Sequence, residues 1–419
     1  EISDEIYKID DAVTAGFGWK LGPFETWDAI GVKEVLKKMK EIGHEPADWV
    51  NKMLANDFHS FYKYEDGIKY YYDINNGQYN KVPGTDKLIM LDNLSEKSVI
   101  WHNAGVTIKD ISDGIINLEF HTKMNTIGRD ILNGINKAID LAEEKYKALI
   151  ISNTGDNFSA GANVGLIFMY AIESEMDELD MAVRAFQNTM MRVRYSNIPV
   201  IAAPHNMVLG GGCELCMHAD RVITHAELYM GLVEFGAGLI PGGGGTKEFA
   251  LRTSEDINDG DPRVNALKNR FLTIGQAKVS TSAEQAFELG YLKRGRDEVI
   301  LSRKHQVSYA KEIAKDMAEK GYVKPNKRRD IKVLGKEGLG IVYAGADSMN
   351  TGHFITDYEK MMSEKLGNVM CGGELSSPTK VSEDHLLNLE RKTFLELAMQ
   401  KKSMERMESI VKKGKPVRN

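Results

Sequence analysis

The spacing of hydrophobic and polar positions changes near residue 105, and this change divides the chain. Before it, helical patterns such as EVLKKMKEIG (34–43) and LGPFETWDAIGV (21–32) alternate with turn signals. DGIKYYYDINNGQYNKVPG (66–84) predicts a hairpin around Asn75-Asn76-Gly77. Residues 83–105 have the pattern of a linker with one or two short strands. We therefore expect a mainly helical first region that ends in a hairpin and a linker.

After residue 105, strand and helix patterns alternate. VTIKDISDGIINLEF (106–120) predicts strand, turn and strand, and a helix (128–144) and a buried strand (147–153) follow. The alternation continues with a helical stretch (163–194), a strand (197–203), a helix from residue 210 and a strand (220–230). The tail, from about 265 to 419, is predicted to be almost wholly helical. Repeated strand–strand–helix units predict an α/β fold that carries its functional residues on the turns.

Composition narrows the class of protein. The chain has 419 residues, 54 Lys and Arg, 60 Asp and Glu and a formal charge of -6, which argues against nucleic acid as the main partner. We find no apolar run long enough for a membrane span, no signal peptide, and only 3 cysteines. These features predict a cytoplasmic protein. The first residue is Glu1 rather than Met, so we expect the chain to be part of a longer one.

The stretch VLGGGCELCMHAD (208–220) places three glycines before a predicted helix with a carboxylate in its first turn. A phosphate loop would need a Lys and a Ser or Thr after its last glycine, whereas Cys213 and Glu214 follow here. If the helix begins at Gly211 or Gly212, its first N–H groups point outward as free donors. Gly211 and Glu214 then share one face of the helix, so a backbone donor and a carboxylate point toward the same spot.

A second small-residue turn, NFSAGAN (157–163), follows a predicted buried strand and is the expected source of a second backbone donor. Two N–H groups aimed at one oxygen would stabilise an enolate. Another carboxylate, Glu234, lies in GLVEFGAGLIPGGGGT (231–246). Paired carboxyls beside such donors suit proton chemistry next to a carbonyl, or addition of water across an activated double bond.

At these residues the chain resembles the enoyl-CoA hydratases of the crotonase superfamily. The matching segments are FSAGAN, GGGCE, Glu234 seven residues before Pro241 in IPGGGGT, TKMN (122–125) and TSAEQAFELGYL (281–292). The resemblance covers roughly residues 105–325. It implies a crotonase-like spiral of strand–strand–helix repeats and hydration of trans-2-enoyl-CoA to 3-hydroxyacyl-CoA in fatty-acid β-oxidation.

Carried over position by position, the resemblance implies that the N–H groups of Ala160 and Gly211 hold the thioester oxygen. Glu214 and Glu234 would grip one water, one as base and one as acid, and which does which stays open. Asn163 stands where the family usually has Asp. The remaining expected substrate-binding residues are Lys123, Met124, Gly161, Ala162, Gly210, Pro241 and Gly242. Lys123 is either a contact to CoA phosphate or a solvated lysine.

The flanks resemble other β-oxidation proteins. AGFGWKLGPFETWDAIGV (15–32) is similar to the C-terminal helical domain of 3-hydroxyacyl-CoA dehydrogenases, and residues 389–419 are similar to the end of bacterial dehydrogenase–hydratase fusions. We therefore expect a partial dehydrogenase domain with linker (1–104), a hydratase domain (105–325) and a C-terminal helical domain (326–419). No glycine fingerprint for a dinucleotide occurs in the first hundred residues, so NAD would serve a missing half and this chain needs no cofactor.

Several residues have competing interpretations. Cys213, Cys216 and His218 have the spacing of metal ligands, but they lie on a predicted helix without a second cysteine pair, so we favour a buried face and expect no metal. His205 is interpreted as a turn residue rather than a base. The methionines favour core positions, although some would suit an adaptable acyl pocket; they are Met169, Met176, Met181, Met190 and Met191.

Two other functions remain open beside hydration. A Δ3-Δ2 enoyl-CoA isomerase would use the same fold, but two glutamates favour the hydratase because moving one proton needs only one. The chain could instead be an inactive docking module for the dehydrogenase half or for a thiolase partner. The expected ligand is an acyl-CoA thioester. The sequence leaves a homo-oligomer open, because this fold commonly assembles as trimers or hexamers but the flanking domains could block that assembly.

Overall fold

The computed structural model describes residues 2–65, 67–256 and 263–419. Two compact units make up the chain, Glu1–Ser98 and Val99–Asn419. Glu1 and Asp66, the first residues of the chain and of the predicted hairpin segment, lie outside the described residues. The expected domain limits at residues 104 and 325 stay predictions.

The first unit contains helices followed by a small antiparallel sheet. Its helices are α1 (Ile6–Phe17), α2 (Pro23–Ile30), α3 (Val32–Glu41) and α4 (Asp48–Ala55). Its strands are β1 (Tyr62–Glu65), β2 (Ile68–Asp73) and β3 (Gln78–Lys81), and three 3-10 turns follow at Thr85–Lys87, Leu91–Asn93 and Glu96–Ser98. The predicted hairpin is confirmed, since β2 pairs with β3 from Tyr70–Lys81 to Asp73–Gln78.

Aromatic side chains form the core of this unit. Phe61 is fully buried, with its ring 5.1 Å from Phe24 and 5.6 Å from Trp27 and Trp49. One carboxylate ties α2 to the start of β1, because the two oxygens of Asp28 accept the N–H groups of Phe61 and Tyr62.

The second unit contains the α/β core and the helical tail. Its strands are β4 (Val99–His102), β5 (Val106–Asp110), β6 (Ile115–Phe120), β7 (Ala148–Ser152), β8 (Val200–Ala202), β9 (Asn206–Leu209), β10 (Arg221–His225), β11 (Leu228–Gly231), β12 (Glu298–Ile300), β13 (Ile331–Val333) and β14 (Thr379–Val381). Its helices are α5 (Arg129–Lys145), α6 (Val164–Glu173), α7 (Met176–Arg194), α8 (Gly211–His218), α9 (Gly245–Glu255), α10 (Arg263–Gly275), α11 (Ala283–Glu288), α12 (Arg303–Glu319), α13 (Gly335–Thr351), α14 (Asp357–Met370), α15 (Glu383–Ala398) and α16 (Lys401–Lys413). Two 3-10 turns, η4 (Lys123–Asn125) and η5 (Glu234–Ala237), lie between them.

The main sheet has the order β12-β10-β8-β7-β6-β5-β4. Its central strands are parallel, and β4 to β6 pair antiparallel. Every residue of β6 and β7 is buried, as expected for parallel strands covered on both faces. A separate parallel pair, β9 and β11, lies outside this sheet. The predicted α/β class is confirmed.

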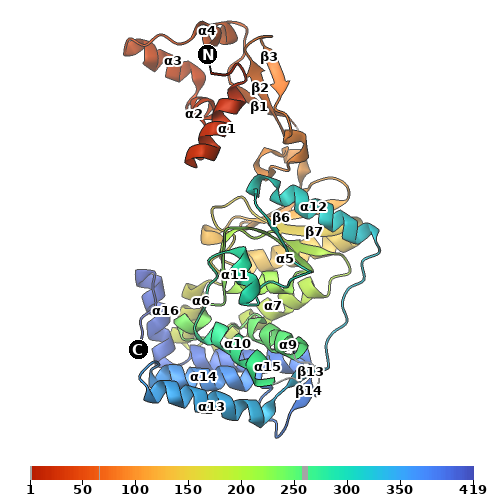
Figure 1. Cartoon of the computed structure of the whole chain (residues 1–419), viewed down its shortest axis with the longest axis vertical. Helices are drawn as coiled ribbons and strands as arrows, with labels where there is room; N and C mark the ends of the chain where they lie inside the picture. The colour runs from red at the N-terminus through yellow and green to blue at the C-terminus, as the bar shows by residue number, and fades with distance from the viewer. Residues whose placement is uncertain (1, 66, 257–262) are drawn as a thin grey trace. The chain divides into compact units, whose positions relative to one another are not determined.

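The helical C-terminal region is confirmed, and two details differ from the prediction. The tail also contains three short strands, since β12 extends the main sheet and β13 pairs with β14. The predicted helical stretch 163–194 is two helices, because Ser174 adopts a left-handed conformation (φ 58°) that ends α6. Figure 1 shows α13, α14 and α15 together with α9 and α10, and α16 alongside α6. Among the described helices, none combines the length and apolar character needed to cross a bilayer.

Candidate active site

The parallel pair of β9 and β11 brings the glycine turn and Glu234 together. Leu209 pairs with Gly231, and the next residue, Gly210, donates its N–H to Gly231 O at 2.8 Å. Because the carboxyl ends of parallel strands meet at one edge, the segments that follow β9 and β11 emerge side by side. An ideal β-carbon on Gly210 would lie 3.0 Å from Glu234 Oε1, and Gly210 has φ 50° and ψ -121°.

The two small-residue turns pack directly against each other. Gly161 has φ 92°, and a β-carbon there would lie 2.8 Å from Leu209 O and 3.3 Å from Gly211 N. A β-carbon on Gly211 would lie 2.6 Å from Phe186 Cζ and 3.5 Å from Ala162 N. Glycine is therefore required at both positions. Gly211 is the first residue of α8, so its N–H has no acceptor one turn earlier within the helix.

The N–H of Ala160 is already engaged in this structure. It donates to Met124 O at 3.1 Å, and the N–H of Gly161 donates to Ser159 Oγ at 3.0 Å. Met124 has φ 55° in the η4 turn, which directs its carbonyl toward this partner. The N–H of Ala160, which is expected to hold the thioester oxygen, is therefore hydrogen-bonded within the protein in this structure.

Glu214 lies in the first turn of α8 and is 3% exposed. Its Oε1 accepts the N–H groups of Gly243 and Gly245, each at 2.8 Å. Burial raises the pKa of Glu214 to about 7, while these two hydrogen bonds and the charge of Lys247 act in the opposite direction.

Glu234 begins η5 and has a different environment. Its Oε2 is buried, and no group of the described residues hydrogen-bonds it. Burial first, and then the charge of Glu214, raise the pKa of Glu234 well above its ordinary value. The two carboxyls are therefore close enough to interact, and Glu234 holds its proton more strongly.

The other expected substrate residues surround this site or lie at its edge. Asn163, the position that departs from the family pattern, caps α6 by accepting the N–H of Leu166 at 3.2 Å. Lys123 and Met124 are exposed. A β-carbon on Gly242 would lie 2.6 Å from Phe394 of α15, and Pro241 O accepts the hydroxyl of Thr246 at 3.0 Å.

Sequence reasoning missed Glu390, a fully buried residue of α15. Its Oε1 accepts the N–H of Gly244 at 2.6 Å and the side-chain amide of Gln187 at 3.1 Å, and its Oε2 accepts the N–H of Lys247 at 2.8 Å. Burial, followed by the charge of Glu214, raises the pKa of Glu390 to about 8. Its position among Leu386, Leu387, Phe394 and Leu397 on the apolar face of α15 was the available signal.

A buried lysine–histidine pair lies behind Glu214. His218 Nδ1 lies 2.7 Å from Glu214 O, a carbonyl that only accepts, so His218 Nε2 is the acceptor for Lys247 Nζ at 3.0 Å. Burial lowers the pKa of both His218 and Lys247. Cys213 and Cys216 are buried on α8, and the described residues include no group of three or more His, Cys, Asp or Glu that could hold a metal.

His205 is hydrogen-bonded to the segment that follows β7. It is buried, its Nε2 is 2.8 Å from Gly155 O, and burial lowers its pKa to about 4. It is therefore neutral near pH 7 and hydrogen-bonded within a turn.

A known family model covers both glutamates and both small-residue turns. Residues 110–254 match the family model described as enoyl-CoA hydratase/isomerase, and they form a crotonase-family domain. The solved enoyl-CoA hydratase from Bacillus halodurans superposes with a TM-score of 0.50 and 14% identity, over 73% of this chain and all of that one. That likeness concerns the fold alone.

Relatives in sequence come from fatty-acid oxidation. The "Probable 3-hydroxyacyl-CoA dehydrogenase" of Bacillus subtilis (strain 168) is 41% identical over 420 residues, which cover 100% of this chain and 52% of that protein. The "Fatty acid oxidation complex subunit alpha" of Pseudomonas savastanoi pv. phaseolicola is 28% identical over 217 residues, 50% of this chain and 27% of that protein. The chain thus spans about half the length of its Bacillus subtilis relative.

Proposed function

We propose that this chain hydrates trans-2-enoyl-CoA to 3-hydroxyacyl-CoA, with Glu214 as the base and Glu234 as the acid. The observation that supports this best is the contrast between the two carboxyls. Glu214 Oε1 accepts two backbone N–H groups, which favour its anion, whereas Glu234 Oε2 is buried without a partner among the described residues. Neighbouring carboxyls with different affinities for a proton are suited to opposite roles.

In the proposed reaction the Glu214 carboxylate removes one proton from a water molecule. The water oxygen forms a bond to C3 of the enoyl group as the C2–C3 double bond opens, and the electron pair moves onto the thioester oxygen. When the carbonyl re-forms, C2 takes the proton of the Glu234 carboxylic acid. The product carries one added water, and proton exchange with solvent restores both glutamates.

The thioester oxygen would be held by backbone N–H groups. Gly211 supplies one at the N-terminus of α8, where the helix dipole also favours negative charge. Ala160 supplies the second once its hydrogen bond to Met124 O opens, so substrate binding has to move η4. Lys123, exposed in the same turn, would then meet the CoA phosphates.

No redox cofactor takes part in this reaction. The dehydrogenase activity named for the Bacillus subtilis relative would use NAD to oxidise the 3-hydroxyacyl product, and we expect that step to need residues beyond this chain. Pure protein given crotonyl-CoA and NAD should therefore form no NADH. A homo-oligomer and a thiolase partner also remain expectations.

The test is hydration of crotonyl-CoA in water enriched in oxygen-18. We expect loss of the conjugated thioester absorbance and a 3-hydroxybutyryl-CoA product that carries the label. Conversion of a 3-enoyl-CoA to the conjugated isomer without labelled product would instead indicate an isomerase. Failure to bind any CoA thioester would favour a docking module.

A further inference from the structure

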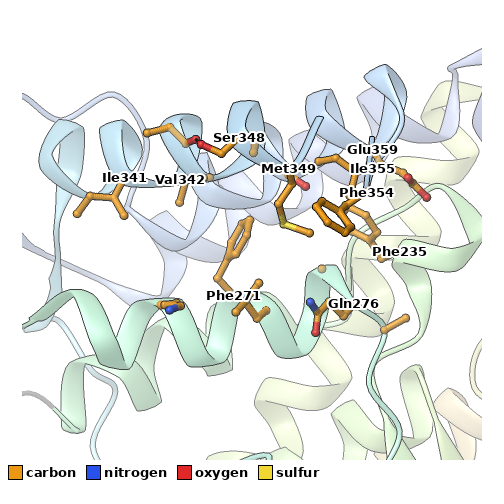
Figure 2. Close-up of a pocket in the computed structure, with 18 of the residues that line it drawn as sticks. Phe235, Phe271, Gln276, Ile341, Val342, Ser348, Met349, Phe354, Ile355 and Glu359 are labelled. Carbon is orange, nitrogen blue, oxygen red and sulfur yellow. Dashed lines mark hydrogen bonds between the residues drawn. The ribbon is translucent and has the colours of Figure 1, made fainter. Parts of the chain in front are cut away.

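A large apolar cavity lies between α10 and α13 in the second unit. Its volume is about 900 Å³, within the range of small-molecule sites. Figure 2 shows Phe271 projecting from α10 toward α13, with Ile341 and Val342 on the opposite side and Phe354 and Phe235 at one end. Other apolar lining residues include Leu267, Met349 and Ile355.

Most of the charged side chains that line the cavity already pair with one another. Glu359 forms ion pairs with Arg418 at 2.9 Å and Arg406 at 3.6 Å, and Arg406 Nε also donates to Asn419 Oδ1 at 2.8 Å. Lys268, the remaining charged residue of the lining, is exposed on α10. Because burying an unpaired charge is costly, the cavity suits an uncharged apolar occupant.

Part of the cavity wall directly follows a residue of the candidate active site in the sequence. Phe235 and Gly236 form part of its wall, and they directly follow Glu234 in η5. Helix α16 holds this turn in place, since Arg406 Nη1 donates to Phe235 O at 3.4 Å. The segment that places the Glu234 carboxyl therefore also forms one end of the cavity.

We propose that this cavity receives the distal part of a long acyl chain, which makes long-chain enoyl-CoA thioesters the preferred substrates. An acyl chain is uncharged, apolar and flexible, and the cavity wall begins at Phe235, one residue after Glu234. This inference rests on the proposed hydration, and its test is chosen to separate the two.

Two glycines of α13 provide the test variant and its matched control. A β-carbon on Gly345, which lines the cavity, or on Gly340, which does not, would meet no atom within 4 Å. The side chain of Gly345→Leu therefore starts in open space and should narrow the cavity. Gly340→Leu makes the same chemical change on the same helix outside the cavity. Both changes raise helix propensity, so both variants should fold.

Each protein is assayed with crotonyl-CoA and trans-2-hexadecenoyl-CoA. We expect Gly345→Leu to lower kcat/KM for the long substrate by about tenfold, the scale of a lost apolar contact in a pocket, and to leave the short substrate unchanged. Gly340→Leu should match the wild type on both. Equal long-chain kcat/KM in the two variants would overturn the inference.

Calorimetry with saturated hexadecanoyl-CoA and butyryl-CoA gives a readout that does not depend on turnover. We expect tighter binding of the long thioester by the wild type and Gly340→Leu, and loss of that preference in Gly345→Leu. If no variant hydrates crotonyl-CoA but this pattern appears, the proposed reaction fails and the acyl site stands. If hydration occurs and Gly345→Leu keeps the long-chain preference, the acyl site fails alone.

Discussion

Glu214 and Glu390 bind alternating N–H groups of one chain segment. Glu214 Oε1 takes those of Gly243 and Gly245, and Glu390 takes those of Gly244 and Lys247. The segment leads into the N-terminus of α9, whose dipole favours both carboxylates. Glu390, on α15 of the helical tail, therefore fixes the same backbone that orients Glu214.

This relationship predicts that Glu390→Gln lowers kcat while KM changes little. A glutamine places an N–H donor against either Gly244 N–H or Lys247 N–H, so the segment shifts and Glu214 loses its alignment. We expect kcat to fall by about tenfold or more, because small misplacements of reacting groups slow catalysis strongly. Steady-state kinetics with crotonyl-CoA measures both kcat and KM of the variant.

Glu383→Gln is the matched control for that change. Glu383 is buried on the same helix and accepts the Tyr195 hydroxyl at 2.7 Å. Its partners are the Tyr195 hydroxyl and the Lys247 ammonium, at 3.8 Å, rather than the Gly243–Gly245 backbone, so a loss of Tm in this variant should not carry a loss of kcat measured well above pH 7. Equal effects of the two variants on kcat would show that Glu390 acts only through general stability.

The raised pKa of Glu214 predicts an acidic limit to activity. Below about pH 7 the carboxyl is protonated and cannot act as a base, so kcat/KM should rise with pH through about 7. At higher pH it should fall again as Glu234 loses its proton. A pH profile that is flat from pH 5 to 7 would contradict the assignment of Glu214 as base.

Lys247 should set the position of that acidic limit. Its charge lowers the pKa of Glu214, so removing it in Lys247→Met should raise this pKa further and move the limit to higher pH. The neutral side chain keeps much of the buried volume of Lys247, which is 0% exposed. A limit that stays in place, in a variant shown to be folded by its circular dichroism, would mean that Lys247 has only a structural role.

Local patterns in the sequence were sufficient to predict much of the site. Gly211 and Glu214 lie at the start of α8, as predicted, and Glu234 follows the short strand β11, while the chemistry of these residues stays a prediction. Gly161 and Gly211 also approach each other closely, as expected for two small-residue turns that supply donors to one oxygen.

Contacts between distant segments could not be predicted in this way. The burial of Glu390 against Gly244 depends on how α15 packs on α9, which no local pattern specifies. The hydrogen bond from Ala160 to Met124 O depends on the left-handed conformation of Met124, a residue type that rarely adopts it. The strands β12 to β14 were missed because each has only three residues.

The central claim is that Glu214 and Glu234 act together on one water, and the kcat of their single and double variants tests it most directly. Glu214→Gln and Glu234→Gln should each lower hydration of crotonyl-CoA by roughly 10²–10⁴-fold without a change of fold. The double variant should be little slower than the slower single one, because the residues act as a unit. Near-native turnover in either single variant, or effects that multiply in the double, would contradict the two-carboxylate mechanism.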